Sequence, residues 1–414
     1  MLKDILGILN EWWIREKISE EKAKPYKRTI FDELKDLLLN YRQIVALTGL
    51  RRVGKTTLIY QLIDLLLKKG TDPKSIIYFS FDEVVEEPMK ILKEYQKLTR
   101  VNWKEEKIFV FFDEIHKLED WSSKIKLLYD SLPNMKLTIS GSASMIEKET
   151  KSNLAGRYFI REVKPLSLRE FAELSMNREI KNLELWRSEL EVLFEQYIRK
   201  PFPEIVGWED EKRISEYIKE LVIEKVKVDL PEIFKNVRTS LLSTLLEMFM
   251  KAPGMILNLS TLSRDLKVHK LTLSEHIFFL EFAKVIRTIK NFRPSIRAES
   301  RKMKKIYPTH IALSFPFYPS LDRGTVFENL VACAWDLKNY WREGSKEIDF
   351  IKRNKALIPI EVKAKENVVK KDIKTLNYFM KKYKIKKGIV VYGGSERRVM
   401  DSIKLIPIID IVFD

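Results

Sequence analysis

Residues 44–57 have the sequence IVALTGLRRVGKTT, and this stretch decides the fold of the first part of the chain. The apolar run Ile44–Thr48 predicts a buried β-strand, and the helical pattern Thr56–Lys69 predicts a helix that Gly70 can cap. Between them, Gly49–Thr56 fits the phosphate-loop pattern G-x-x-x-x-G-K-[ST]. A strand, a loop of this pattern and a helix in this order predict a nucleotide-binding site.

The residue types in this loop suit a chain of phosphates. Gly49 and Gly54 allow the backbone to curl so that its N–H groups face the phosphate oxygens. Lys55 adds a positive charge for the β- and γ-phosphates, and the Thr56 hydroxyl can ligate Mg²⁺. We therefore expect ATP and Mg²⁺ as cofactors. The residues predicted to contact the nucleotide are Gly49, Leu50, Arg51, Arg52, Val53, Gly54, Lys55, Thr56, Thr57 and Ser140.

Three further β-rich runs alternate with helical patterns up to residue 170. They are Ile76–Phe81, Ile108–Phe112 and Leu137–Ser140. This alternation predicts a parallel sheet with helices on both faces. The run Ile108–Phe112 is apolar throughout, as expected of a central strand that is buried on both sides.

Two acidic residues follow that central strand. A carboxylate at the tip of a buried strand is costly unless a cation lies nearby, so Asp113 is predicted to support Mg²⁺. Glu114 is the candidate base that polarises the attacking water; the alternative is that it only caps the next helix. At the end of the next strand, Ser140 and Ser142 are candidates to contact the γ-phosphate.

The positive charge of the chain is concentrated in two windows. The net charge is +17, and residues 284–305 and 346–387 carry +8 and +9 of it. A localised basic excess favours a polyanion such as nucleic acid, bound largely without sequence preference; a solvated lysine-rich surface is the alternative. The single cysteine fits a cytoplasmic protein, and the sequence predicts neither a signal peptide nor a membrane span.

Three short helical patterns predict a helix–turn–helix unit. They are Leu241–Met250, Thr261–Leu266 and a third that opens with a capping box at Thr272–Glu275. The basic segment Arg287–Lys305 is expected to form a wing after them. The side chains predicted to be exposed towards a DNA major groove are Lys270, Thr272, Ser274 and His276. The alternative is a domain used only for packing or for a protein partner.

The C-terminal region contains KEIDF, a short turn and LIPIEVKAK. An antiparallel hairpin centred near Lys355 would place Asp349 opposite Glu361, and alternation would place Lys363 on the same face as Glu361. Glu328, on the preceding helical pattern, would add a third carboxylate. We therefore predict metal ligands at Glu328, Asp349 and Glu361, and a nuclease site made of Asp349, Glu361 and Lys363.

The phosphate loop, the Asp-Glu and Ser-Gly-Ser strand ends and the segment LAGRYFIREVKPLSLREF resemble archaeal and bacterial ATPases of the AAA+ superfamily. In those proteins a domain of unknown function lies at the C-terminus. The resemblance implies ATP hydrolysis with catalytic roles for Lys55 and Glu114. It also implies a homo-oligomer, because an arginine of one subunit often completes the ATP site of the next subunit in that superfamily. Arg157 is the candidate for this arginine. The alternatives for Arg157 are a phosphate sensor in its own subunit or a structural ion pair.

Residues 320–400 resemble the restriction-endonuclease-like fold, on the order helix-Glu328, strand-Asp349 and strand-Glu361-x-Lys363. Many members of that fold bind nucleic acid without cutting it. The resemblance therefore implies a nucleic-acid-binding domain, and metal-dependent cleavage is the finer expectation.

The predicted fold class is α/β, with a P-loop parallel-sheet core, a helical lid, a winged helix and a restriction-endonuclease-like domain. The predicted segments are a helical lead-in (1–40), the AAA+ core (41–170), the lid (171–238), the winged helix (239–310) and the C-terminal domain (311–414). Three functions stay open. They are an ATP-driven enzyme that acts on DNA, a nucleotide-operated switch whose C-terminal domain only binds nucleic acid or protein, and a chaperone-like ATPase.

Overall fold

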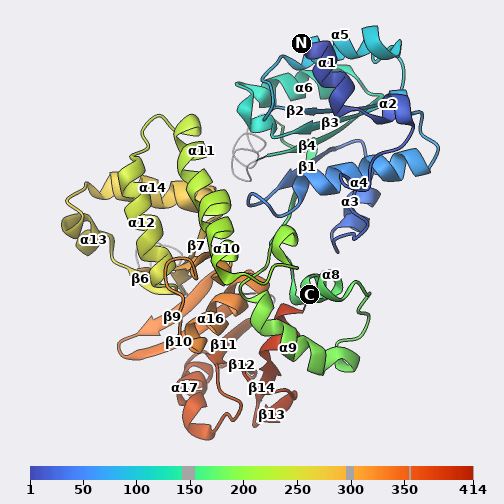
Figure 1. Ribbon diagram of the computed structural model, residues 1–414. Coiled ribbons are helices and arrows are strands. Elements are labelled where there is room, and N and C mark those ends of the chain that lie inside the picture. Colours follow the sequence, from blue (N-terminus) through green and yellow to red (C-terminus); the bar gives the residue numbers. More distant parts are fainter. Residues whose placement is uncertain (142–153, 295–302, 354–355, 414) are drawn as a thin grey trace. The chain divides into compact units, whose positions relative to one another are not determined.

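The computed structural model describes residues 1–141, 154–294, 303–353 and 356–413. The chain divides into two compact units, Met1–Lys164 and Pro165–Asp414. Both contain helices and strands (Figure 1), so the predicted mixed α/β class is confirmed.

The first unit is built on a five-stranded sheet in the order β2-β3-β4-β1-β5. All of its strand pairs are parallel, as predicted. Its strands are β1 (Ile44–Thr48), β2 (Ile76–Ser80), β3 (Ile108–Asp113), β4 (Met135–Ser140) and β5 (Tyr158–Glu162). The first four match the predicted runs to within two residues. The edge strand β5 could not be predicted from an apolar run, because most of its residues are half-exposed.

Helices cover both faces of this sheet (Figure 1). One face packs against α1 (Leu2–Leu9), α5 (Pro88–Thr99) and α6 (Trp121–Ser131), whose apolar residues form a core with the strands. The other face carries α3 (Phe31–Asn40) and α4 (Lys55–Lys68), which contact each other. The remaining short elements are α2 (Trp12–Arg15), η1 (Pro73–Ser75) and η2 (Ile115–Lys117).

The second unit is built on a nine-stranded sheet in the order β13-β14-β12-β11-β10-β9-β7-β8-β6. The strands are β6 (Met255–Leu257), β7 (Ile286–Asn291), β8 (Lys304–Pro308), β9 (Asn339–Glu343), β10 (Lys346–Arg353), β11 (Leu357–Lys363), β12 (Gly388–Tyr392), β13 (Arg398–Met400) and β14 (Ile403–Pro407). β7 pairs with β8 in antiparallel and with β9 in parallel orientation. The boundary predicted between residues 310 and 311 therefore does not separate two sheets, because edge pairing joins the strands on both sides of it.

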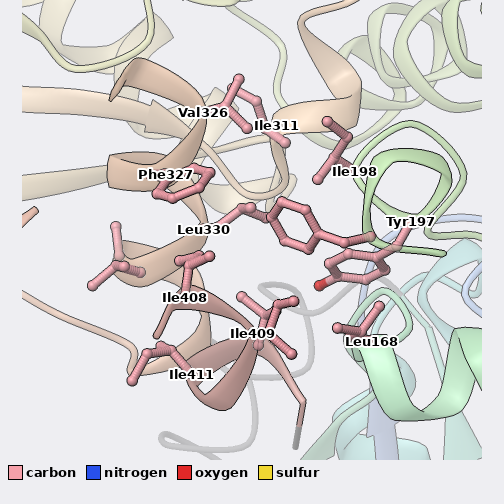
Figure 2. Close-up of a cluster of buried hydrophobic side chains, with 14 of the residues drawn as sticks. Leu168, Tyr197, Ile198, Ile311, Val326, Phe327, Leu330, Ile408, Ile409 and Ile411 are labelled. Atoms are coloured by element: carbon pink, nitrogen blue, oxygen red, sulfur yellow. The ribbon is translucent and has the colours of Figure 1, made fainter. Parts of the chain in front are cut away.

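The main core of the second unit lies between helices and one face of this sheet. It contains residues of α8 (Leu168–Met176), α9 (Arg187–Tyr197), α16 (Arg323–Ala334) and α18 (Ile408–Val412). Figure 2 shows their side chains converging, with Phe327 and Leu330 of α16 near Ile408 and Ile409 of α18. A separate core joins α17 (Lys374–Lys382) to residues of β9, β10, β12 and β14.

Residues 171–238 are largely helical, as predicted, but α8 and α9 pack into the core of the second unit. A role as a lid over a nucleotide remains a prediction. The other elements of this region are η3 (Glu184–Trp186), η4 (Pro203–Ile205), α10 (Glu211–Glu216), the π-helix η5 (Tyr217–Glu224) and α11 (Lys225–Ile233). Two further single turns are η6 (Ile311–Leu313) and η7 (Lys370–Ile373).

The three predicted short helices are α12 (Thr239–Lys251), α13 (Leu259–Asp265) and α14 (Lys270–Phe282), followed by the hairpin β7–β8. The predicted capping box at Thr272 is wrong, because the imidazole of His269 caps α14 instead. The predicted exposure of His276 is also wrong: its side chain is buried, and its Nε2 accepts the Arg238 N–H at 2.8 Å. The most exposed apolar side chains of α14 are Leu271 (62%) and Phe278 (50%), which do not suit a DNA groove.

Candidate functional site

The loop between β1 and α4 has the backbone geometry that a phosphate loop requires. Gly49 and Gly54 have φ angles of 141° and 96°, and Arg52 has a φ of 66°. A Cβ atom on Gly49 would lie 2.2 Å from the backbone oxygen of Val163, so only glycine fits there. Gly54 is the N-cap of α4. The loop therefore leads into a helix N-terminus, where backbone N–H groups favour anions.

The Lys55 side chain is buried at this loop. Its ammonium donates to the backbone oxygens of Gly49 (3.3 Å) and Leu50 (3.1 Å). It also lies 3.7 Å from Glu114 Oε1. A buried ammonium that is held by two carbonyls and one carboxylate can exchange these acceptors for phosphate oxygens, which are stronger acceptors.

Asp113, at the end of β3, accepts hydrogen bonds from three hydroxyl groups. Its Oδ2 accepts from Thr56 (2.7 Å) and from Tyr78 (3.0 Å), and its Oδ1 accepts from Ser140. Burial and the neighbouring Glu114 raise the pKa of this carboxyl, while the hydroxyls of Ser140 and Thr56 oppose that rise. The predicted pair of Thr56 and Asp113 is thus in direct contact.

Glu114 lies directly after Asp113 but in a different environment. Its backbone is left-handed, with φ of 51°, and its N–H donates to Ser140 Oγ at 3.2 Å. Its carboxylate lies between Lys55 and the imidazole of His116, whose Nδ1 is 3.3 Å from Oε2. Glu114 precedes η2 without capping it through its side chain. The carboxylate is therefore positioned beside the loop lysine and can act on a water molecule there.

The Ser140 hydroxyl connects the two acids, since it donates to Asp113 and accepts the Glu114 N–H. The predicted direct contact of Ser140 with the γ-phosphate would require it to leave these partners. Ser142, the other candidate, lies outside the described residues.

Arg157 lies just before β5, at the amino end of the strands. Its backbone oxygen accepts from the N–H of Ile44, the first residue of β1, whereas the phosphate loop follows the last residue of β1. Its guanidinium forms an ion pair with Asp130, with Nε 2.7 Å from Oδ1. This placement does not support a phosphate sensor within the same subunit. Of the predicted roles, the structure shows the ion pair, and completion of a neighbouring subunit's site stays a prediction.

Two residues that sequence reasoning missed also hold the site. Tyr78, on β2, reaches Asp113 because β2 and β3 are neighbouring parallel strands. Arg28 donates to the backbone oxygens of Val53 (2.9 Å) and Lys164 (3.0 Å). The order of parallel strands was the one available signal for Tyr78, and the sequence contains no motif that includes Arg28.

The residues of this site fit a nucleotide with Mg²⁺. The loop brings the N-terminus of α4 and the buried Lys55 ammonium together, where both can bind phosphate. Thr56 and Asp113 offer adjacent oxygen atoms of the kind that Mg²⁺ binds. These residues come from β1, α4 and β3, which meet at the carboxyl edge of the sheet.

The C-terminal hairpin has the predicted register. β10 and β11 pair antiparallel with Phe350 opposite Ile360, so Asp349 and Glu361 occupy the next facing positions. Asp349 Oδ2 accepts the N–H of Val362 at 2.7 Å. Lys363 Nζ lies 2.8 Å from Glu361 Oε1, as expected for residues on one face.

Strand β8 adds two residues to this group that the sequence did not predict. The Tyr307 hydroxyl donates to Glu328 Oε2 at 2.9 Å. Lys305 Nζ lies 2.5 Å from Glu347 Oε1 and interacts electrostatically with Glu328 and Asp349. We call the residues Lys305, Tyr307, Glu328, Glu347, Asp349, Glu361 and Lys363 the carboxylate cluster.

Burial dominates the electrostatics of this cluster. Burial and the charge of Asp349 raise the pKa of Glu361 to about 8 and that of Glu328 to about 7. Burial also raises the pKa of Asp349 itself. Burial alone would lower the pKa of Lys305, but the nearby carboxylates outweigh it and raise that pKa.

The cluster brings the predicted carboxylates close together but does not arrange them as a set of metal ligands. Within the ranges that the structure describes, no group of three or more His, Cys, Asp or Glu side chains is placed to hold a metal ion. One carboxylate oxygen, Glu361 Oε2, is buried without a hydrogen-bond partner among these residues. As arranged here, Glu328, Asp349 and Glu361 do not fit a divalent metal.

A dense lysine surface surrounds α17. We call its exposed members the α17 lysines: Lys365, Lys370, Lys371, Lys374, Lys381, Lys382, Lys384, Lys386 and Lys387. Two of them have acidic partners, Lys365 with Asp372 and Lys382 with Glu343. The others have no ion-pair partner in the described part of the chain. An uncompensated surface of this kind attracts polyanions.

Three known families match parts of the chain. Residues 41–172 match the AAA domain, residues 190–314 match a domain of unknown function (DUF8612), and residues 323–411 match another (DUF4143). Together with the loop geometry, the first match shows an AAA-type P-loop nucleotide-binding domain in the first unit.

Among known proteins, the uncharacterized protein MJ1637 of Methanocaldococcus jannaschii is 33% identical over 168 residues. The match covers 39% of this chain and 35% of that protein, so the chain spans about a third of this relative. The uncharacterized protein MJ1544 of the same organism is 25% identical over 388 residues, which are 88% of this chain and 84% of that one.

Among solved structures, one match is a STAND ATPase with a tetratricopeptide repeat sensor, PH0952 from Pyrococcus horikoshii. It is 14% identical with a TM-score of 0.29, over 77% of this chain and 47% of its own. Separately, no helix in the described ranges has the length and apolarity needed to cross a membrane.

Proposed function

We propose that the first unit binds ATP with Mg²⁺ and hydrolyses it. The observation that carries this proposal is the placement of Glu114, beside the phosphate-loop lysine and directly after an Asp113 that Thr56 contacts. A domain that only bound nucleotide would need the loop and Asp113, but it would not need a second carboxylate at this position.

Each residue has a role that follows from its contacts. The loop N–H groups and Lys55 would bind the β- and γ-phosphates and offset their charge. Thr56 and Asp113 would hold Mg²⁺, which neutralises charge on the phosphate oxygens when bound. Glu114 would orient a water molecule and accept its proton as the water oxygen bonds to the γ-phosphorus and the bond to ADP breaks.

The test is the release of phosphate from ATP by the full chain with Mg²⁺, together with nucleotide binding measured by calorimetry. Lys55→Ala should abolish binding, because this buried ammonium lies at the N-terminus of α4, where the β- and γ-phosphates would bind. A chain that binds ATP but releases no phosphate above the Lys55→Ala background would reduce the first unit to a nucleotide-operated switch.

For the second unit we propose nucleic-acid binding, supported by the α17 lysines and by the exposed Lys290 of β7. The exposed side of α14 does not support the predicted major-groove contact, since Leu271 and Phe278 dominate it. Contact through lysines implies recognition of phosphates and not of bases. The winged-helix and restriction-endonuclease-like assignments are part of this proposal, and both agree with the order of elements in this unit.

The test is binding of single-stranded, duplex and branched DNA to the full chain, with the ATPase rate measured in parallel. Stimulation of the rate by DNA would support an ATP-driven enzyme that acts on DNA. Absence of binding to all three forms at low salt would remove the nucleic-acid proposal and favour a protein partner.

Metal-dependent cleavage by Asp349, Glu361 and Lys363 is the finer proposal from the sequence. It requires Mg²⁺ or Mn²⁺ among carboxylates that are not arranged as metal ligands in this structure. Of the two roles predicted for the second unit, binding is therefore the one that the geometry supports better.

A further inference from the structure

The carboxylate cluster contains a cation of its own. We propose that the Lys305 ammonium is a built-in counter-ion that occupies the place of a divalent metal among Glu328, Glu347 and Asp349. The cluster is then complete without a metal, and the second unit binds nucleic acid without cutting it. This inference rests on the proposed function only in treating the cluster as part of a nucleic-acid-binding domain, and it does not depend on ATP hydrolysis.

The first observation is the burial of Lys305. Its side chain is 5% exposed, although lysine is almost never fully buried unless it is paired. Its Nζ lies 2.5 Å from Glu347 Oε1, and its next electrostatic partners are Glu328 and Asp349. One ammonium therefore faces three carboxylates that come from α16 and β10.

The second observation is that β8 presents this cation as part of a fixed arrangement. Lys305 and Tyr307 alternate along the strand, so both side chains lie on the same face. The Tyr307 hydroxyl holds Glu328 at 2.9 Å, while Lys305 holds Glu347. Strand β8 thus supplies both the positive charge and the positioning of one of the carboxylates.

The third observation concerns the oxygen atoms that a metal would need. Asp349 Oδ2 accepts the Val362 N–H, and Glu361 Oε1 is paired with Lys363. Glu361 Oε2 is buried with no hydrogen-bond partner within the described residues. A divalent cation at this oxygen would lie near Lys363, and one among Glu328, Glu347 and Asp349 would lie near Lys305. Like charges at short range repel strongly in a buried site. Metal entry therefore requires that the Lys305 charge be removed.

The test is a calorimetric titration of Mn²⁺ into the full chain without nucleotide. The variants are wild type, Lys305→Met and Lys304→Met, each with and without Asp349→Asn. Lys304 is the matched control, because it precedes Lys305 on β8 and also loses one lysine charge. Subtracting the Asp349→Asn titration removes any Mn²⁺ that binds at Thr56 and Asp113.

We expect no Asp349-dependent Mn²⁺ binding in wild type or in Lys304→Met. In Lys305→Met we expect such binding to appear, because one full charge is removed from a buried site. Its affinity should be at least about tenfold higher than the weakest affinity that the titration can detect. Equal Asp349-dependent affinity in wild type and Lys305→Met would overturn the proposal, and so would a folded Lys305→Met variant that gains none.

A second measurement keeps the proposal testable if Lys305→Met does not fold. Millimolar Mn²⁺ should shift the Tm of wild type and the Tm of Asp349→Asn by the same amount. An extra shift in wild type would show that metal enters the cluster with Lys305 in place, which contradicts the proposal. DNA binding measured on the same wild-type sample tests the proposed function separately from the counter-ion proposal. If DNA does not bind, the proposed function of the second unit is wrong, whatever the metal titration shows.

Discussion

At the scale of single residues, two adjacent acids at one strand end have different surroundings. Asp113 is 2% exposed and is held by the hydroxyls of Thr56, Tyr78 and Ser140. Among the described residues Glu114 has no such set of donors, and its carboxylate lies between Lys55 and His116. A carboxylate held on both oxygens suits a structural or metal-supporting role, whereas one beside the phosphate-loop lysine can accept a proton from water.

The first prediction tests this division of roles. Glu114→Gln keeps the shape of the side chain but cannot accept a proton, so ATP binding should persist while turnover falls by at least about 100-fold. Nucleotide binding by calorimetry and phosphate release measure the two effects. Glu119→Gln is the matched control, because Glu119 is an exposed acid of the same segment and its loss should leave turnover unchanged. Near-normal turnover in Glu114→Gln would remove the base assignment.

The second prediction concerns the pH dependence of the carboxylate cluster. Burial and Asp349 raise the pKa of Glu361 to about 8 from an ordinary value of 4.5. Above pH 4.5 the unfolded chain releases this proton while the folded chain keeps it, so the free energy of unfolding falls as the pH rises towards 8. Glu361→Gln stays neutral, and its Tm relative to wild type should therefore rise between pH 5 and pH 8.

Thermal unfolding at several pH values measures this effect. Glu366→Gln, at an exposed position nearby, is the control and should follow the wild-type profile. A Glu361→Gln profile that runs parallel to wild type would show that Glu361 is ionised in the folded protein throughout this range.

At the scale of elements, short apolar runs that end at glycine or at polar residues located four of the five strands of the first unit and missed β5. The hairpin register was also predictable, because the short connection between β10 and β11 fixes which residues face each other. The pairing of β7 with β9 could not be predicted, since Lys290 and Asn339 lie far apart in the sequence. Lys305 joins the cluster from a strand beyond that pairing, which explains why no sequence motif includes it.

The third prediction tests how the phosphate loop packs in its unit. Gly49→Ala would place a Cβ atom 2.2 Å from the Val163 backbone oxygen at a φ of 141°, so the loop must shift. Gly70→Ala is the matched control: its φ is also positive, at 81°, but no atom of the described residues lies within 4 Å of the added Cβ. The control should lose about 1–2 kcal/mol for backbone conformation alone, and Gly49→Ala should lose clearly more.

Thermal unfolding without nucleotide, followed by circular dichroism, compares the two variants. Each kcal/mol corresponds to roughly 2–4 °C for a domain of this size class. Equal losses in both variants would mean that the loop moves away from Val163 without cost and that the steric argument for Gly49 is wrong.

At the scale of the whole molecule, the chemistry is divided between the two compact units. The phosphate loop, Asp113 and Glu114 lie in residues 1–164, and both basic windows lie in residues 165–414. These windows account for the entire net charge of +17. A polyanion should therefore bind the second unit, and the rest of the chain should contribute little to the salt dependence of binding.

The last prediction locates that binding on the surface of α17. Lys374→Glu combined with Lys381→Glu reverses two charges at exposed positions that have no acidic partner in the described part of the chain. Because released counterions dominate such binding, DNA affinity should fall by at least about tenfold, and the slope of log K against log salt should become shallower by about 2. The control, Lys69→Glu with Lys93→Glu, makes the same charge change at exposed positions of the first unit. If net charge alone attracted the DNA, both double variants would weaken binding equally. A loss confined to the α17 variant, equal for unrelated DNA sequences, would show a local and sequence-independent phosphate contact.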